Sequence, residues 1–161
     1  MQADDICFLS ISQAAKLLSD KEVSPVELVS AHLERIAETD GRLNSFITLL
    51  AEDARAQAAE AEREIRSGKY RSPLHGIPVG LKDLYSTRGI RTTVGSRILR
   101  EFVPDYDATV VARLKDAGAV ILGKLNLTEG AMAAYHPDFD IPVNPWDPGL
   151  WPGVSSSGSG V

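Results

Sequence analysis

The sequence predicts an α/β fold, in which a mixed, mostly parallel sheet carries helices on its faces. The first observation is the order strand, helix, strand between residues 76 and 122, which is the pattern of a βαβ unit. The second is the continuous apolar run at residues 119–122, because strands covered on both faces lack polar alternation. With 161 residues and 43% hydrophobic content, the chain is long enough for one domain with a core.

Two helices are predicted in the N-terminal part of the chain. A short apolar stripe indicates a helix at residues 12–18. A longer one is expected at residues 25–39, because Ser24 and Glu27 have the spacing of a capping box and Pro25 suits the first helical position.

A strand and a third helix follow. Residues 44–50 are rich in β-branched and aromatic side chains, which favours a short strand. Residues 51–67 are rich in Ala, Glu and Arg, and Gly68 stands where a C-terminal helix cap belongs. This segment therefore predicts a helix that ends at the glycine.

The pattern of residues in the middle of the chain predicts the βαβ unit. Residues 76–81 are apolar and punctuated by Gly and Pro, and they end at the charged pair Lys82 and Asp83. A helix is expected at residues 107–117, before the buried strand at 119–122. We expect the two strands to be parallel neighbours in one sheet.

The C-terminal part is less regular. A helix is expected at residues 126–134, followed by a Pro-rich stretch too broken for regular structure. The run of Ser and Gly at residues 155–159 has two interpretations. Its composition is typical of a flexible linker, whereas two tryptophans just upstream favour a folded turn whose amides and hydroxyls can contact a ligand.

Composition argues against several classes of protein. The net charge of −5 and the absence of a Lys/Arg block exclude the footprint of a nucleic-acid binder. The N-terminus has acidic residues where a signal peptide needs positive charge, and no apolar run is long enough for a membrane span. With a single cysteine, Cys7, these features lead us to expect a cytoplasmic protein.

The three histidines do not indicate a metal site. His32, His75 and His136 are scattered singly, without metal-ligand spacing, and are interpreted as structural or surface residues. No cofactor-binding motif is recognised, so neither a metal nor a cofactor is expected.

Lys82 also has two interpretations. A lysine after an apolar strand is commonly a surface residue whose stem covers its apolar neighbour. The C-terminal end of a parallel strand is, however, where open α/β sheets gather their active sites, and a lysine whose amine is neutral can accept a proton there. Asp83 would point to the opposite side of the strand, so it need not hold Lys82 protonated.

Five motifs, in order and spacing, resemble the amidase signature family of serine hydrolases. They are GIPVGLKDL (76–84), TTVGS (92–96), DATVVARLKDAGAVILGKLNLTEGA (107–131), NPW (144–146) and PGVSSSGSG (152–160). The resemblance runs from about Ile11 to the last residue. The last motif departs from the family's usual PGGSSGGS, because Val154 and Ser157 stand where Gly is commoner.

The resemblance implies a Ser, cis-Ser, Lys triad for the hydrolysis of amide bonds through an acyl-enzyme. Lys82 matches the base, and Ser155 matches the bridging serine whose peptide bond is cis. We expect the Lys82 amine to lie within hydrogen-bond reach of the Ser155 hydroxyl. In the family the nucleophilic serine lies in a DxGGS-type motif, which is expected beyond residue 161.

The resemblance also implies further residues near the site. Ala131 and Ser156 are expected to contact the substrate, a small carboxamide. Asn126 and Glu129 match a segment beside the active site, where a hydrogen-bonding role is expected.

The resemblance further implies that residues 1–161 are one partial domain, the N-terminal part of the amidase-signature fold with an incomplete sheet. Residues 1–70 would be its helical N-terminal region, and residues 71–161 the start of the α/β core ending in the catalytic loop. An exposed apolar face is expected on such a piece.

Three hypotheses about function remain at this stage. The chain belongs to an amidase, or to the amidase-type subunit of a tRNA-dependent amidotransferase with partner subunits, or it is a truncated binding or assembly domain. Lacking the nucleophile, the chain alone is expected to be inactive. A homo-oligomer is possible, whereas no nucleic acid or membrane partner is expected.

Overall fold

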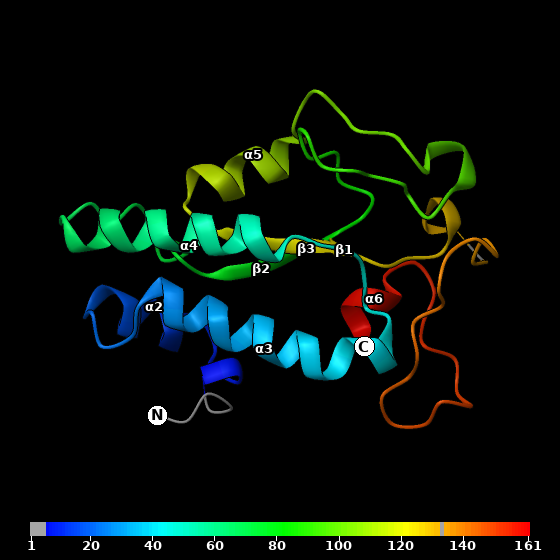
Figure 1. Ribbon diagram of the computed structural model, residues 1–161, viewed down its shortest axis with the longest axis horizontal. Helices are drawn as coiled ribbons and strands as arrows, with labels where there is room; N and C mark the ends of the chain where they lie inside the picture. Colours follow the sequence, from blue (N-terminus) through cyan, green and yellow to red (C-terminus); the bar gives the residue numbers. More distant parts are fainter. Residues whose placement is uncertain (1–5, 133) are drawn as a thin grey trace. The chain divides into compact units, whose positions relative to one another are not determined.

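The computed structural model describes residues 6–132 and 134–161, and it confirms the predicted α/β class (Figure 1). The helices and strands, in chain order, are α2 (Ile11–Ser19), α3 (Pro25–Leu43), β1 (Phe46–Leu49), α4 (Ala51–Arg66), β2 (Pro78–Lys82), α5 (Thr109–Asp116), β3 (Val120–Leu125) and α6 (Ser157–Gly160). Two short 3₁₀ turns, η1 (Arg97–Leu99) and η2 (Glu129–Ala131), lie between them.

The strands form one mixed sheet in the order β1-β3-β2. Strand β1 runs antiparallel to β3. Beside β2 the hydrogen bonds advance in the same direction on both strands: the Val120 N–H donates to Ile77 O, and the Asp83 N–H donates to Leu125 O. This is the pattern of parallel strands, so the predicted pairing of the two strands of the βαβ unit is confirmed.

The central strand β3 is almost entirely buried. A glycine on this strand permits the close approach of β1, because a Cβ at Gly123 would lie 2.4 Å from the Thr48 carbonyl oxygen. The ladder between the two strands is irregular between Phe46 and Thr48, next to this contact.

The described chain divides into two compact units that share the strands β2 and β3. Unit 1 is formed by Met1–Glu38, Leu50–Val79 and Arg113–Leu122, and unit 2 by Thr39–Leu49, Gly80–Ala112 and Gly123–Val161. The units alternate along the chain and do not coincide with the regions 1–70 and 71–161. The single partial domain therefore stays a prediction.

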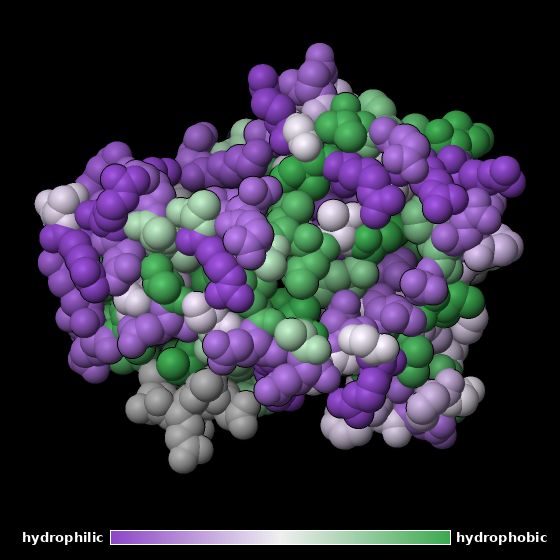
Figure 2. All heavy atoms as spheres, in the orientation of Figure 1, coloured by the Kyte–Doolittle hydropathy of each residue, from purple (hydrophilic) through white to green (hydrophobic). Residues whose placement is uncertain are grey.

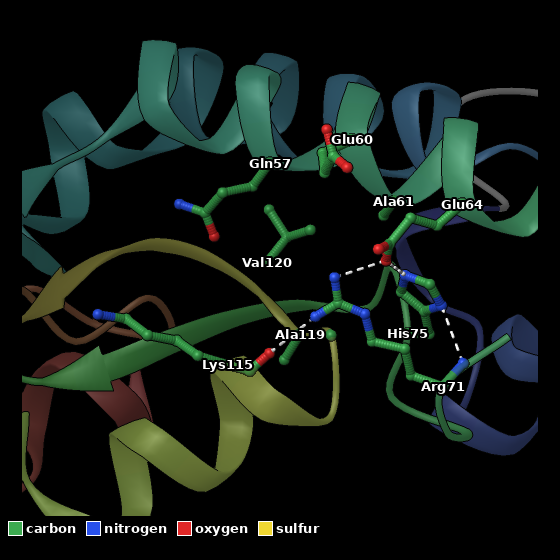
Figure 3. Close-up of a pocket in the computed structure, with 10 residues that line it drawn as sticks. Gln57, Glu60, Ala61, Glu64, Arg71, His75, Lys115, Ala119 and Val120 are labelled. Atoms are coloured by element: carbon green, nitrogen blue, oxygen red, sulfur yellow. Dashed lines mark hydrogen bonds and ion pairs between the residues drawn. The ribbon is translucent and has the colours of Figure 1, made fainter. Parts of the chain in front are cut away.

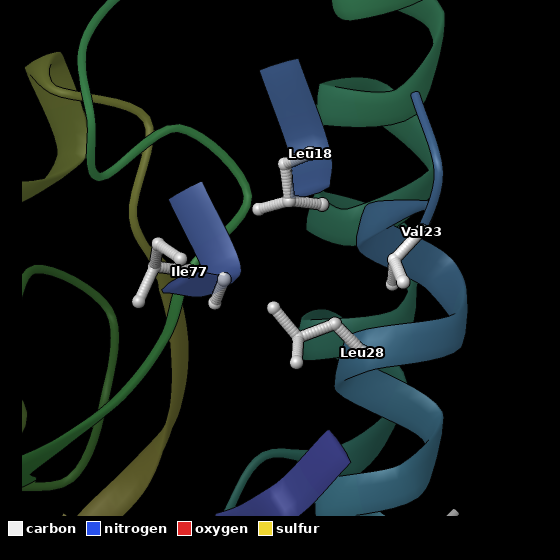
Figure 4. Packing of buried hydrophobic residues seen from close by; sticks show 5 residues of the cluster. Leu18, Val23, Leu28 and Ile77 are labelled. Atoms are coloured by element: carbon white, nitrogen blue, oxygen red, sulfur yellow. The ribbon is translucent and has the colours of Figure 1, made fainter. Parts of the chain in front are cut away.

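The core of unit 1 includes a cluster in which α2 and α3 pack against the residue before β2 (Figure 4). Its members are Ala14, Leu18, Val23, Leu28 and Ile77, all nearly inaccessible to water. The apolar stripes of the two helices meet in this cluster. The apolar residues that the sequence pattern places on one side of each helix are therefore buried.

The helix ends follow the predicted signals. The Ser24 N–H donates to Glu27 Oε2 at 2.8 Å, and the Glu27 N–H donates to Ser24 Oγ at 3.1 Å, which is the predicted capping box. Helix α4 ends just before Gly68, whose φ of +89° is the left-handed conformation expected after a helix.

The helix expected at residues 126–134 is not formed, and this prediction was wrong. Only Glu129–Ala131 makes a single 3₁₀ turn. Gly130 and Ala131 have positive φ angles of 61° and 57°, a conformation that interrupts an α-helix. Ala133 lies outside the described residues.

Apolar side chains are exposed between polar ones on the face drawn in Figure 2. Several exposed apolar residues belong to the segment before α6, namely Ile141, Trp146, Leu150, Trp151 and Val154. No helix in the described part of the chain combines the length and the hydropathy of a membrane span.

Candidate functional site

The Ser/Gly run at residues 155–159 is packed within unit 2. Ser157 and Gly158 in α6 are buried, and the Gly158 N–H donates to Asn126 O at 3.0 Å. A Cβ at Gly158 would lie 2.4 Å from both Ser45 O and Asn126 N, so the contact requires glycine. This packing favours the interpretation of the run as part of a site over that of a flexible linker.

Ser155 and Ser156 lie at the start of this packed segment. Ser155 is half-buried and Ser156 is exposed. Every peptide bond between described residues is trans, so the cis bond that the resemblance implies at Ser155 is not present. The trans form is favoured by about 3 kcal/mol for a residue other than proline.

Lys82 lies at the end of β2 and is half-buried. Within residues 6–132 and 134–161, its amine has no hydrogen-bond or ion-pair partner, so the expected bond to Ser155 is not formed. The segment that carries Ser155 is instead held through the Gly158 backbone and Asn126. Both predicted catalytic side chains therefore belong to unit 2 but do not interact.

A second lysine, Lys124, was missed by the sequence reasoning. It lies in β3 and is 0% exposed. Its Nζ donates to Tyr85 O and Thr92 Oγ1, both at 2.7 Å, and lies 3.3 Å from Thr87 Oγ1 and from Asp83 Oδ1. Burial lowers the pKa of Lys124, and the charge of Asp83 opposes this effect.

Asp83 is held just as tightly. It is also 0% exposed, and its Oδ2 accepts hydrogen bonds from Thr93 N–H at 2.9 Å and Thr93 Oγ1 at 2.6 Å. Its Oδ1 makes an ion-pair contact with Lys124 that lacks hydrogen-bond geometry. The available signal was the lysine inside the apolar strand VILGKL, because a buried ammonium needs a buried partner.

Asn126 supports the segment between β3 and α6, as expected. Its Nδ2 donates to Asn44 O at 3.1 Å and to Asp140 O at 2.8 Å, and its Oδ1 accepts from the Leu127 N–H. Glu129 uses its backbone N–H to bind Ala134 O. The Asn126 amide therefore ties three segments of unit 2 together.

Unit 1 contains a separate charged cluster around Glu64 (Figure 3). Its carboxylate contacts Lys69 Nζ and Arg71 Nη2, both at 2.6 Å, and His75 Nε2 at 3.2 Å. Hydrogen bonds from Arg71, which has the larger effect, and from Lys69 lower the pKa of Glu64 to about 2. The cluster borders a cavity of about 340 Å³ beside α4.

The histidines match their structural or surface interpretation. His75 is 1% exposed, and its Nδ1 accepts a hydrogen bond from the Arg71 N–H. Burial, followed by the charge of Arg71, lowers the pKa of His75. His32 contacts Leu28 O, and His136 accepts from the Asp138 N–H. Among the described residues, no group of three or more His, Cys, Asp or Glu could hold a metal ion.

The sequence matches the family described as Amidase over residues 27–161. Over 161 residues, all of this chain, it is 47% identical to the putative amidase AmiD of Mycobacterium tuberculosis (strain ATCC 25618 / H37Rv), covering 34% of that protein. It is 50% identical over 157 residues to a glutamyl-tRNA(Gln) amidotransferase subunit of Geobacter sp. (strain M21), covering 96% of this chain and 32% of that one. The chain thus spans about a third of the length of the curated relatives it matches.

Solved structures show the same likeness. A native peptide amidase from Stenotrophomonas maltophilia matches with a TM-score of 0.83 and 38% identity, over 94% of this chain and 33% of that chain. A fatty acid amide hydrolase matches with a TM-score of 0.91 and 26% identity, over 97% of this chain and 28% of that chain. Both the resemblance drawn from the motifs and the predicted fold are therefore confirmed.

Proposed function

Because the chain belongs to the amidase family, we propose that the protein containing it hydrolyses the C–N bond of a small carboxamide through an acyl-enzyme. The observation that carries this proposal is the packed Ser/Gly run, which brings Ser155 into the same unit as Lys82 at the end of β2. A linker would have no need for the close contact of Gly158 with Asn126 and Ser45.

Lys82 is the proposed base and Ser155 the proposed bridging hydroxyl. A serine hydroxyl is a weak nucleophile until a base removes its proton, and a neutral lysine amine can do so. A hydroxyl between the two can accept one proton and donate another, passing the first from the nucleophile to the amine and later to the leaving nitrogen. The free amine of Lys82 suits this role, because no carboxylate among the described residues pairs with it.

Ala131 and Ser156 are proposed to contact the substrate. Ser156 is exposed at the start of the packed run, and its hydroxyl is free to meet a polar group. Ala131 has a φ of +57° on a half-buried turn, and its side chain is small.

A second candidate is the amidase-type subunit of a tRNA-dependent amidotransferase. The observation that favours it is the 50% identity to a protein named as an amidotransferase subunit, which exceeds the 47% identity to the putative amidase. The same site would then release ammonia for partner subunits. A homo-oligomer is the other proposed assembly.

We further propose that residues 1–161 alone do not form an acyl-enzyme. Lys82 and Ser155 match two members of the triad, and none of the motifs matched in this chain carries the third. Mass spectrometry after fluorophosphonate treatment tests this, with no adduct expected on any serine. An adduct on any serine of residues 1–161 would overturn it.

The activity is tested in a protein that carries residues 1–161 within the full length of its relatives. Lys82→Ala is expected to remove nearly all hydrolysis of simple carboxamides, and Ser155→Ala to lower kcat by orders of magnitude. Lys21→Ala and Ser12→Ala, at exposed positions outside the Ser/Gly run, serve as matched controls that retain activity. A folded longer protein that is neither labelled nor active on carboxamides, with or without added amidotransferase subunits, would contradict the proposal.

A further inference from the structure

We propose that Lys124 neutralises the buried charge of Asp83 and thereby keeps the amine of Lys82 free, so that Lys124 and Asp83 are positioning residues for the proposed base. The inference rests on the role proposed above for Lys82. It concerns Lys124 and Asp83, a pair to which the matched motifs assign no role. The contacts that the pair makes in unit 2 support it.

Asp83 is held by contacts to both its backbone and its side chain. Its backbone N–H donates to Leu125 O at 2.9 Å, and its carbonyl accepts from the Val94 N–H at 3.1 Å. Its carboxylate is bound by Thr93 and faces Lys124. Since Asp83 follows Lys82 directly, these contacts also fix the backbone from which the proposed base projects.

Lys124 must be the hydrogen-bond donor to the oxygen atoms that surround its Nζ. The hydroxyl of Thr87 donates to Tyr85 O and that of Thr92 donates to Ile90 O, both at 3.1 Å. Each hydroxyl therefore turns a lone pair toward the Lys124 Nζ. An ammonium group, with three N–H donors and no acceptor, suits a cage of oxygens, whereas a neutral amine would direct its lone pair at one of them.

Lys124 is the positive charge in contact with the buried carboxylate of Asp83. The other contacts of the pair come from carbonyl oxygens, backbone N–H groups and the hydroxyls of Thr87, Thr92 and Thr93, none of which titrates in the physiological range. On the β1 side, the guanidinium of Arg91 is held by Ile47 O and Thr48 Oγ1. Lys124 is therefore the group that offsets the charge of Asp83.

The consequence for Lys82 follows from sequence and geometry. Its immediate neighbour in the chain is a carboxylate, and an unpaired negative charge nearby favours the protonated form of an amine. Because Lys124 occupies that carboxylate, the neighbour does not act on Lys82 as an unpaired charge. In the described chain the Lys82 amine has no ionic partner, as this arrangement requires.

The test uses variants that change the balance in opposite directions. In the 161-residue chain, lysine amines are labelled with ¹³C-methyl groups and titrated by NMR, with Lys82→Arg used to assign the signal of Lys82. Lys124→Met leaves Asp83 uncompensated and is expected to raise the titration midpoint of Lys82, whereas Asp83→Asn is expected to lower it. Lys124→Arg and the double variant Asp83→Asn/Lys124→Met restore balance and are expected to stay near the wild-type midpoint.

The outcomes separate positioning from a merely structural role. Opposite shifts in the two single variants support the proposal, and shifts of the same sign, or none, in variants that keep native circular dichroism overturn it. If Lys124→Met does not fold, Asp83→Asn against the double variant decides alone. The titration needs no turnover, so an absence of amidase activity in the longer protein would sink the proposed function without affecting this result. Where activity is present, the acid limb of its kcat/KM profile is expected to move with the Lys82 midpoint.

Discussion

The two charged clusters of this protein combine similar groups in different surroundings. Around Glu64 in unit 1, the cationic partners Lys69 and Arg71 are 65% and 33% exposed. In unit 2, both Lys124 and Asp83 are 0% exposed. Water can replace a lost partner in the first cluster but not in the second, so the same kind of ion pair has a different consequence when it is broken.

The sequence context explains the difference. Glu64 lies in the last turns of the amphipathic helix α4, and its partners come from the loop that follows. Lys124 lies in the central strand of the sheet, where both faces are covered. The Glu64 cluster, whose cationic partners reach water, is therefore expected to respond to pH and salt, whereas the Lys124–Asp83 pair is part of the core and fixes the end of β2.

The largest effect is expected when the buried pair is broken. Lys124→Met should lower the free energy of unfolding by about 3–5 kcal/mol, because it leaves the Asp83 charge buried without compensation. Asp83→Asn/Lys124→Met should recover part of this loss, since no charge is then left unpaired. Urea denaturation measures both, with Lys16→Met at an exposed position as the control. A double variant no more stable than Lys124→Met would contradict the comparison.

Most elements of the fold were predictable because their signals are local. The capping box at Ser24, the glycine after α4 and the apolar run of β3 each act over a few residues, and each is found where expected. The helix expected at 126–134 failed because Gly130 and Ala131 adopt positive φ angles within a segment that the Asn126 amide ties to distant backbone. Such long-range contacts leave no periodic pattern in the sequence.

The candidate site was predictable in part. Lys82 could be singled out from its place at a strand end, and the motifs indicated Ser155. Lys124 was missed because its partners, from Asp83 to Thr92, come from a separate loop that only the folded sheet brings to β3. The absence of the Lys82–Ser155 bond likewise depends on how the loop packs, which the sequence does not specify locally.

An intermediate effect is expected when His75, a buried member of the Glu64 cluster, is displaced by packing. Gly118 has a φ of +87°, and a Cβ there would lie 2.5 Å from His75 Cδ2. Gly118→Ala should therefore lower the free energy of unfolding by about 2–4 kcal/mol, combining left-handed strain with overpacking. Gly68→Ala is the matched control, because its φ is +89° but nothing lies within 4 Å, and it should cost about 1–2 kcal/mol. Equal losses would show that His75 is not a rigid neighbour.

A smaller effect is expected from pH, and it should distinguish the clusters. With its pKa lowered to about 2 in the fold, against about 4.5 for a free carboxyl, Glu64 contributes stability that is present above pH 4.5 and lost as the pH falls toward 2. His75, whose pKa is lowered from 6.5 by burial, adds a loss that begins below about pH 6.5. Denaturation midpoints from pH 7 to 2 should show that Glu64→Gln reduces the acidic part of the slope, to which Asp20 and Glu27 also contribute, and retains the part that begins near pH 6.5. An unchanged slope below pH 4.5 would exclude Glu64 as its source.

The smallest effect is expected at the edge of the exposed cluster. Lys69→Gln removes the 2.6 Å contact with Glu64 Oε1, but this side chain is 65% exposed and water can take its place. Glu64 Oε2 keeps its contacts with Arg71 and His75, so the carboxylate is not left without partners. The thermal midpoint of Lys69→Gln should therefore be indistinguishable from wild type in about 0.5 M salt, with only a slight fall at low salt, where exposed charges are less screened. A loss that is large and independent of salt would mean that this cluster behaves like the buried pair.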